Sequence, residues 1–137
     1  MEDDGFCFVC GPDNPAGLRL RFTRLPGDEG CETTVTFADT YQGWPGVVHG
    51  GLLSTLLDEA MVKAATHRSG TCVTAEITVK FKHTARTGTP YRVRGHVIST
   101  RHRLVFTEGW IEDLQGNHIA SATAKFFALD RLPEQRS

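Results

Sequence analysis

The sequence predicts a single α+β domain, in which an antiparallel sheet of five to six strands wraps around one central helix. Three observations lead to this prediction. Segments that alternate apolar and polar residues stand before and after one long segment with apolar residues at helical spacing. That helical segment is apolar over a wide arc, so it must be largely buried. The length of 137 residues suits one domain, residues 1–137, with one core.

Residues 1–16 are rich in glycine, proline and asparagine, which predicts an irregular lead-in. Residues 18–22 (LRLRF) alternate apolar and basic side chains and predict a half-buried strand. A turn over residues 26–30 (PGDEG) separates this strand from residues 33–37, which are β-branched and alternating and predict a second strand. The two strands are expected to pair as a hairpin.

A glycine- and proline-rich loop over residues 41–46 ends the second strand, and a helix is predicted from Leu52 to about His67. The Ser69-Gly70 pair is the signal that ends the helix. The apolar positions, spaced by three and four residues, are Leu52, Leu53, Leu56, Leu57, Ala60, Met61, Ala64 and Ala65.

The remaining chain predicts four strands, over residues 72–82, 91–100, 104–112 and 119–129. Residues 131–137 are polar and are expected to fray. A meander of this length forms an antiparallel sheet, whose concave face can bury the apolar helix. This arrangement is typical of the hotdog fold, and the pattern alone leaves other helix-on-sheet folds open.

Composition excludes several classes of protein. The formal net charge is -1, so no overall basic field attracts nucleic acid. No apolar run approaches the roughly 18–20 residues that span a bilayer. The acidic start Met-Glu-Asp-Asp lacks the basic and apolar regions of a signal peptide. We therefore expect a cytoplasmic protein, with its four cysteines as free thiols.

Cys7 and Cys10 form a CxxC pair that is followed by residues 11–15 (GPDNP). A zinc site needs about four ligands, usually two such pairs or one pair with histidines. The sequence has no second CxxC and no HxxxH. A redox CxxC normally opens a helix after a strand, whereas a turn follows this one. A structural turn is favoured over a metal or redox centre, and no metal site is predicted.

The most informative motif is His49-Gly50-Gly51 at the start of the helix, with Asp58 nine residues after the histidine. The motif and the strand order resemble the hotdog acyl-CoA thioesterases of the phenylacetate-pathway (PaaI) type, over about residues 17–129. Thr74, in residues 74–77 (TAEI), resembles the site Thr or Ser of that family. The resemblance implies acyl-CoA hydrolysis without a cofactor, in a homodimer or homotetramer whose site takes its acid from the partner helix.

The chemistry of thioester hydrolysis agrees with these residues. The free N–H groups at a helix N-terminus can stabilise an oxyanion, and glycines let the carbonyl approach. We assign this role to the Gly50 N–H, with Gly51 adjacent. Asp58 lies seven residues beyond Gly51, about 10 Å along the axis, so it cannot easily reach the oxyanion site of its own helix. A site shared between two subunits solves this problem.

Each candidate has a plainer interpretation beside the functional one. Asp58 would activate water or attack the thioester directly, or it would pair with Lys63 or Arg68 on a solvated face. Glu59 is the second candidate for the acid. His49 orients the thioester or the loop, or it only bonds backbone at the helix start. Thr74 holds the attacking water, or it is an ordinary strand residue.

The substrate-binding candidates are less distinct. Some family members have an asparagine six residues before the histidine, whereas this chain has Gly43 there, with Gln42 as a possible substitute. Lys80, Lys82 and His83 form a basic cluster that would hold the CoA phosphates, or they are solvated residues on a strand edge. Trp44 would line the acyl pocket or pack the loop.

Two other functions remain open. A hotdog hydratase would need a histidine five residues after the acid, and this chain has Lys63 at that spacing from Asp58. A non-catalytic acyl-CoA-binding module would keep the glycines without needing Asp58.

Overall fold

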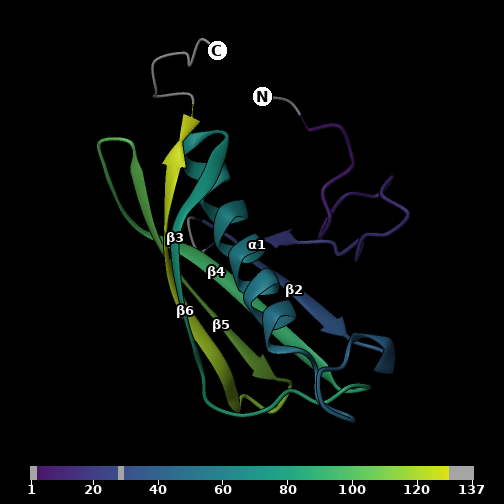
Figure 1. Cartoon of the computed structure of the whole chain (residues 1–137). Helices are drawn as coiled ribbons and strands as arrows, with labels where there is room; N and C mark the ends of the chain where they lie inside the picture. The colour runs from purple at the N-terminus through teal and green to yellow at the C-terminus, as the bar shows by residue number, and fades with distance from the viewer. Residues whose placement is uncertain (1–2, 28–29, 130–137) are drawn as a thin grey trace.

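One long helix lies across a six-stranded antiparallel sheet in the computed structural model, which describes residues 3–27 and 30–129 (Figure 1). The strands lie in the order β1-β2-β4-β5-β6-β3, and the sheet curves behind α1. The predicted hotdog fold is confirmed. The elements in chain order are β1 Thr23–Arg24, β2 Cys31–Thr36, the 3₁₀ helix η1 Asp39–Tyr41, α1 Gly50–Ser69, β3 Cys72–Phe81, β4 Pro90–Arg101, β5 Leu104–Asp113 and β6 His118–Ala128.

Local sequence signals set both ends of α1. The His49 side chain caps the first turn by accepting a hydrogen bond from the Gly51 N–H, so the helix begins two residues before the predicted start. At the other end Gly70 adopts a φ of 77°, which favours glycine, and its N–H bonds the Thr66 carbonyl at 3.0 Å. The predicted end of the helix is confirmed.

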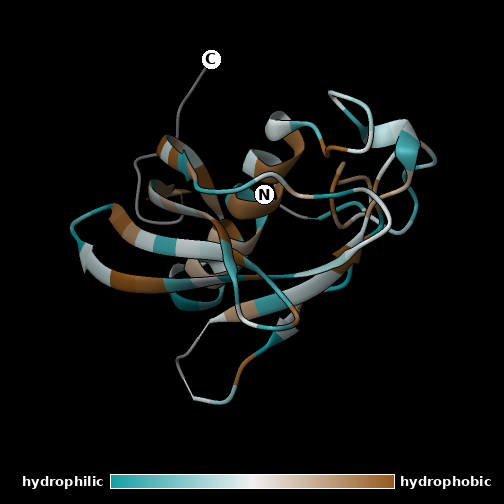
Figure 2. Ribbon diagram, turned by 90° about the horizontal axis from the view of Figure 1, so that it is seen from below, coloured by the Kyte–Doolittle hydropathy of each residue, from teal (hydrophilic) through white to brown (hydrophobic). Residues whose placement is uncertain are grey.

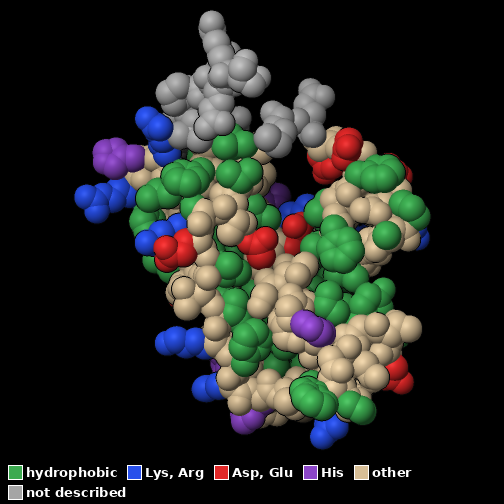
Figure 3. Space-filling view, viewed as in Figure 1, with side chains coloured by type: hydrophobic (Ala, Val, Ile, Leu, Met, Phe, Trp, Pro, Cys, Tyr) green, Lys and Arg blue, Asp and Glu red, His purple; other side chains and the backbone are tan. Residues whose placement is uncertain are grey.

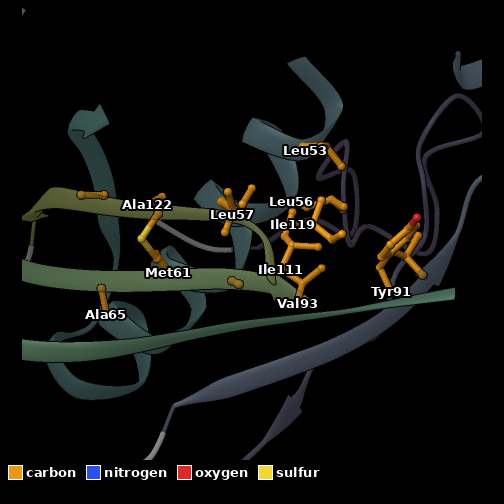
Figure 4. Packing of buried hydrophobic residues seen from close by; sticks show 14 of the residues in the cluster. Leu53, Leu56, Leu57, Met61, Ala65, Tyr91, Val93, Ile111, Ile119 and Ala122 are labelled. Carbon is orange, nitrogen blue, oxygen red and sulfur yellow. The ribbon is translucent and has the colours of Figure 1, made fainter. Parts of the chain in front are cut away.

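The core lies between α1 and the concave face of the sheet. Leu56, Leu57 and Met61 of α1 are fully buried, in one cluster with Val93, Ile111 and Ala122 of the sheet (Figure 4). The strands carry alternating bands of hydrophobic and hydrophilic residues, as their period of two requires (Figure 2). No helix in the described part of the chain is long and apolar enough to cross a membrane.

A cross-strand pair of glycines lets α1 approach the sheet closely. Gly95 on β4 lies opposite Gly109 on β5. A Cβ on Gly95 would lie 2.5 Å from the Ala60 carbonyl carbon and 2.7 Å from the Met61 nitrogen, both of which are helix backbone. Backbone cannot move aside as a flexible side chain can, so this strand position requires glycine.

We expect Gly95→Ala to lower the free energy of unfolding by about 1–3 kcal/mol or more, because the added methyl group overpacks the helix–sheet contact. Denaturant unfolding would measure the change. Gly43→Ala is the matched control, since a Cβ there would make only ordinary contacts, the nearest at 3.5 Å. Equal stability of the two variants would contradict this account of the packing.

The prediction of a strand over residues 18–22 is wrong. Arg19 has a φ of 53°, which interrupts an extended backbone. The Leu18 and Leu20 N–H groups instead bond the Phe8 and Val9 carbonyls, so this segment joins the irregular lead-in. The hairpin partner of β2 is the short strand β1, which follows residue 22. The predicted frayed tail, residues 131–137, lies outside the described residues.

The strand β3 forms one edge of the sheet, and only β6 pairs with it among the described residues. Most of its side chains are exposed, including Val73 and Phe81. A long edge strand with exposed apolar side chains is a template for pairing with another chain.

Candidate active site

The start of α1 presents an open backbone donor. The glycine pair has two backbone N–H groups. The Gly51 N–H donates a hydrogen bond to the His49 Nδ1 at 2.9 Å. The Gly50 N–H makes no hydrogen bond to any other residue in the described ranges 3–27 and 30–129. Gly50 is exposed, so its donor and the positive end of the helix dipole are available to a ligand. His49 takes the capping role, which the sequence left as one of two alternatives.

A surface pocket of about 470 Å³ lies beside this helix start, between η1 and α1. Gln42 supports the pocket wall, because its Oε1 accepts a hydrogen bond from the Gly46 N–H at 3.0 Å. Trp44 is 80% exposed, so it does not pack the loop within one chain. The lining residues are Gln42, Gly43, Trp44, Val47, Val48, His49 and Gly50.

Asp58 and Thr74, predicted from separate segments, come together. The Thr74 hydroxyl donates to the Asp58 Oδ1 at 2.7 Å. Asp58 is half-buried on α1, and Thr74 lies on the edge strand β3 just before the bulge at Ala75. No ion pair joins Asp58 to Lys63 within the described residues, so the carboxylate is held by a neutral donor that fixes its orientation.

The two parts of the site lie at opposite ends of β3. Gly50 is next to the Phe81 end, since a Cβ on Gly50 would lie 3.8 Å from the Phe81 ring. Asp58 is next to the Thr74 end. Asp58 lies eight positions after Gly50 in the helix, about 12 Å along the axis. Within one chain the donor and the carboxylate cannot therefore act on the same atom.

Comparison with known families gives a match to the thioesterase superfamily over residues 45–120, more than half of the chain. The chain belongs to the thioesterase superfamily. This membership assigns it to the thioester hydrolases, and the matched residues include the helix start, Asp58 and Thr74. A comparison with curated proteins found no match.

Solved structures of thioesterases share the fold. One thioesterase superfamily protein is 28% identical with a TM-score of 0.80, covering 89% of this chain, and this chain spans only 60% of that protein. The Escherichia coli PaaI protein from the phenylacetic acid degradation operon is 21% identical with a TM-score of 0.72, over 80% of this chain and 83% of its own. A hypothetical thioesterase from Streptococcus pneumoniae, crystallised with coenzyme A, is 18% identical with a TM-score of 0.73. The match covers 86% of this chain and 91% of that protein.

The other acid of this thioesterase, Glu59, has different surroundings from Asp58. Its side chain is buried, with 8% exposed, and both carboxylate oxygens lie 3.7 Å from the Cys7 Sγ. Burial raises the pKa of the Cys10 thiol to about 12, although the neighbouring Lys63 opposes the shift. The structure thus separates Glu59 from the Asp58–Thr74 pair and places it with the CxxC turn.

The basic candidates divide between two faces of the sheet. Lys80 is paired in register with Ser121 and lines a pocket of about 440 Å³ with Glu108 and Trp110, on the face opposite α1. Lys82 and His83 are exposed just beyond the Phe81 end of β3, and their N–H groups bond the Ile119 carbonyl at 2.8 and 3.1 Å. Lys82 and His83 therefore lie beyond the Gly50 end of the strand, whereas the Lys80 side chain, near the same end, lies on the opposite face of the sheet.

Sequence reasoning missed two neighbours of the site. Phe81 was predicted only as part of the strand over residues 72–82, yet its ring lies next to Gly50. The CxxC turn had no visible third partner, because Glu59 follows Cys7 by 52 residues. Long separations along the chain leave no periodic signal, so only the folded chain reveals such contacts.

Proposed function

We propose that this thioesterase hydrolyses acyl-CoA thioesters to a free carboxylic acid and CoA, at sites shared between two subunits. One observation above all supports the proposal. The open Gly50 N–H and the Asp58–Thr74 pair lie at opposite ends of the same exposed edge strand. Two copies of the chain can bring these ends together, whereas one copy cannot.

The geometry of β3 supports a symmetric dimer. A two-fold axis through the middle of this edge pairs β3 antiparallel with the partner's β3. The Phe81 end of one strand then lies against the Thr74 end of the other. Each Gly50 N–H consequently approaches the partner subunit's Asp58. The same pairing covers Val73 and Phe81, which are 40% and 53% exposed in the single chain.

In the proposed reaction, the thioester carbonyl oxygen accepts a hydrogen bond from the Gly50 N–H. Asp58 of the partner subunit removes a proton from water, whose oxygen attacks the carbonyl carbon. The C–S bond then breaks, and the CoA sulfur leaves and takes up a proton. The alternative is attack by the carboxylate itself, which forms an anhydride that water hydrolyses. In both routes the Gly50 N–H stabilises negative charge on the same oxygen.

Charge and exposure support CoA as the leaving group. The face that carries α1 has acidic side chains near its middle, and Lys and Arg side chains mainly at its margins (Figure 3). Lys82 and His83 at the Gly50 end would hold CoA phosphates at such a margin, while Trp44 and the Gly50 pocket would take the acyl part. A structural relative from Streptococcus mutans is bound to acetyl CoA.

The test is a panel of acyl-CoA esters with detection of the released thiol. Wild type should hydrolyse at least one of them, with one molecule of free CoA for each acid formed. Binding of acyl-CoA without release of thiol from any ester would replace this proposal by the non-catalytic binding module.

Thr74→Val should lower kcat by about 10–100-fold, because a hydrogen bond to a carboxylate contributes about 1.5–3 kcal/mol to its positioning. Thr74→Ser keeps the hydroxyl and should keep most of the activity. Steady-state kinetics on the preferred ester would measure both variants. If kcat falls equally in Thr74→Val and Thr74→Ser, the loss comes from the altered packing of the strand and not from the hydrogen bond to Asp58.

A further inference from the structure

The CxxC turn of the lead-in closes tightly and packs on α1. The Gly11 N–H donates to the Cys7 carbonyl at 2.8 Å, and the Cys10 N–H donates to the Cys7 Sγ at 3.5 Å. A Cβ on Gly11 would lie 2.4 Å from the Cys7 nitrogen, so this closure requires glycine. Backbone donors that point at a sulfur atom stabilise it as a metal-bound thiolate.

Glu59 of α1 supplies a third ligand atom. The sulfur atoms of Cys7 and Cys10 and a carboxylate oxygen of Glu59 all lie within 4.8 Å of one another. Glu59 is 8% exposed, and within residues 3–27 and 30–129 no lysine or arginine makes a salt bridge to it. Lys63, one turn later on α1, lies near this carboxylate without forming a salt bridge to it, so a divalent cation would compensate the buried charge more strongly.

The spacing fits a tetrahedral metal ion. Zinc binds cysteine sulfur at about 2.3 Å and carboxylate oxygen at about 2.0–2.2 Å. At a tetrahedral angle these lengths separate sulfur from oxygen by about 3.5 Å. The observed separations between the Cys7 Sγ and both Glu59 oxygens are 3.7 Å. We propose that Cys7, Cys10 and Glu59 form a zinc site that joins the lead-in to α1.

The charges balance around such an ion. Two thiolates and one carboxylate carry three negative charges. A divalent cation neutralises two of these, so the site keeps a net charge of about −1. Lys63 lies one turn after Glu59 on α1, next to the Cys10 thiol, and supplies the remaining positive charge. A redox cysteine pair would instead need an electropositive setting, and the Glu59 carboxylate beside these sulfurs opposes that chemistry.

The neighbouring surface gives access to the fourth coordination position. Cys10 and Lys63 line a pocket of about 620 Å³ that opens to solvent. A zinc ion with three protein ligands keeps one position for water or another small ligand. The site therefore has an entry path as well as three ligands.

Zinc bound at this site would fix the lead-in and the turn of α1 that carries Asp58. The lead-in between residues 3 and 22 has neither helix nor strand, so zinc would hold it against the helix by coordinate bonds. Glu59 is the next residue after Asp58, and its coordination would fix this turn of α1. The proposal concerns metal binding and does not depend on the hydrolytic activity.

The experiment is a metal titration of the reduced, metal-free protein. Zinc should bind at one ion per chain, measured with a competing chromophoric chelator, and should raise Tm. Cobalt should produce a sulfur-to-metal charge-transfer band, which reports thiolate ligands directly. Cys7→Ser and Glu59→Gln should each weaken zinc binding by at least about 100-fold, the upper end of what mutation of outer-shell partners costs.

Two matched variants make the result decisive. Cys72→Ser removes a thiol elsewhere in the chain, whose sulfur donates a hydrogen bond to the Gly70 carbonyl at 3.2 Å, and should bind zinc as wild type does. Asp58→Asn changes the neighbouring carboxylate and should also keep zinc. The proposal is overturned if reduced wild type binds no zinc at one ion per chain, if the cobalt band is absent, or if Cys72→Ser loses zinc as strongly as Cys7→Ser.

Discussion

Asp58→Asn is expected to lower kcat for acyl-CoA hydrolysis by about 10²–10⁴-fold, the usual contribution of a positioned general acid or base. Asparagine has the same shape and can still accept the hydrogen bond that Thr74 now donates at 2.7 Å. The loss therefore reports the charge and basicity of the carboxylate. Steady-state kinetics should show KM changed far less than kcat.

Glu59→Gln is the comparison that separates the two adjacent acids. Glu59 is buried against the CxxC turn, and Asp58 faces Thr74 on the edge strand. If Glu59→Gln abolished hydrolysis while Asp58→Asn left it intact, Glu59 would be the acid and the proposed site would be wrong. If acyl-CoA still binds to Asp58→Asn without hydrolysis, binding and catalysis are separable, as the proposal requires.

Gly50→Pro should lower kcat by about 10²–10³-fold, the cost of one oxyanion donor. Proline removes the N–H but is favoured at the first helical position, so α1 should persist. His49 has a φ of -58° and a ψ of 129°, an extended conformation that a following proline accepts. Gly50→Ala is the control, because it keeps the N–H and its Cβ meets only the Phe81 ring at 3.8 Å.

Equal losses in Gly50→Pro and Gly50→Ala would mean that the space at this position matters rather than the N–H group. Circular dichroism and Tm would first establish that both variants keep the fold. An intact fold with selective loss in the proline variant is the expected result.

Mixing the two inactive variants tests the shared site. If Gly50 and Asp58 act across subunits, a Gly50→Pro/Asp58→Asn heterodimer holds one intact site and one doubly altered site. Random mixing makes half of the dimers heterodimers, so about a quarter of wild-type activity should return. A site within one chain would return none, and analytical ultracentrifugation would show separately whether dimers form.

Much of the fold was accessible from local pattern. The periods of 3.6 and 2 placed α1 and the four strands β3 to β6 close to their observed bounds. The strand predicted over residues 18–22 failed because alternation cannot reveal a left-handed residue such as Arg19, which the contacts of the lead-in impose. The glycine pair Gly95 and Gly109 was also invisible, since its role depends on a helix far away in sequence.

The sequence by itself determined the fold class, the family and the candidate site residues at the helix start. These depend on short-range spacing, as in His49, Gly50 and Asp58, which a helix converts directly into geometry. Only the tertiary structure decided which residues meet across the chain. It brought Thr74 to Asp58 and the CxxC turn to Glu59, because such contacts arise from how the sheet curves and how the lead-in packs, and neither is encoded in a local period.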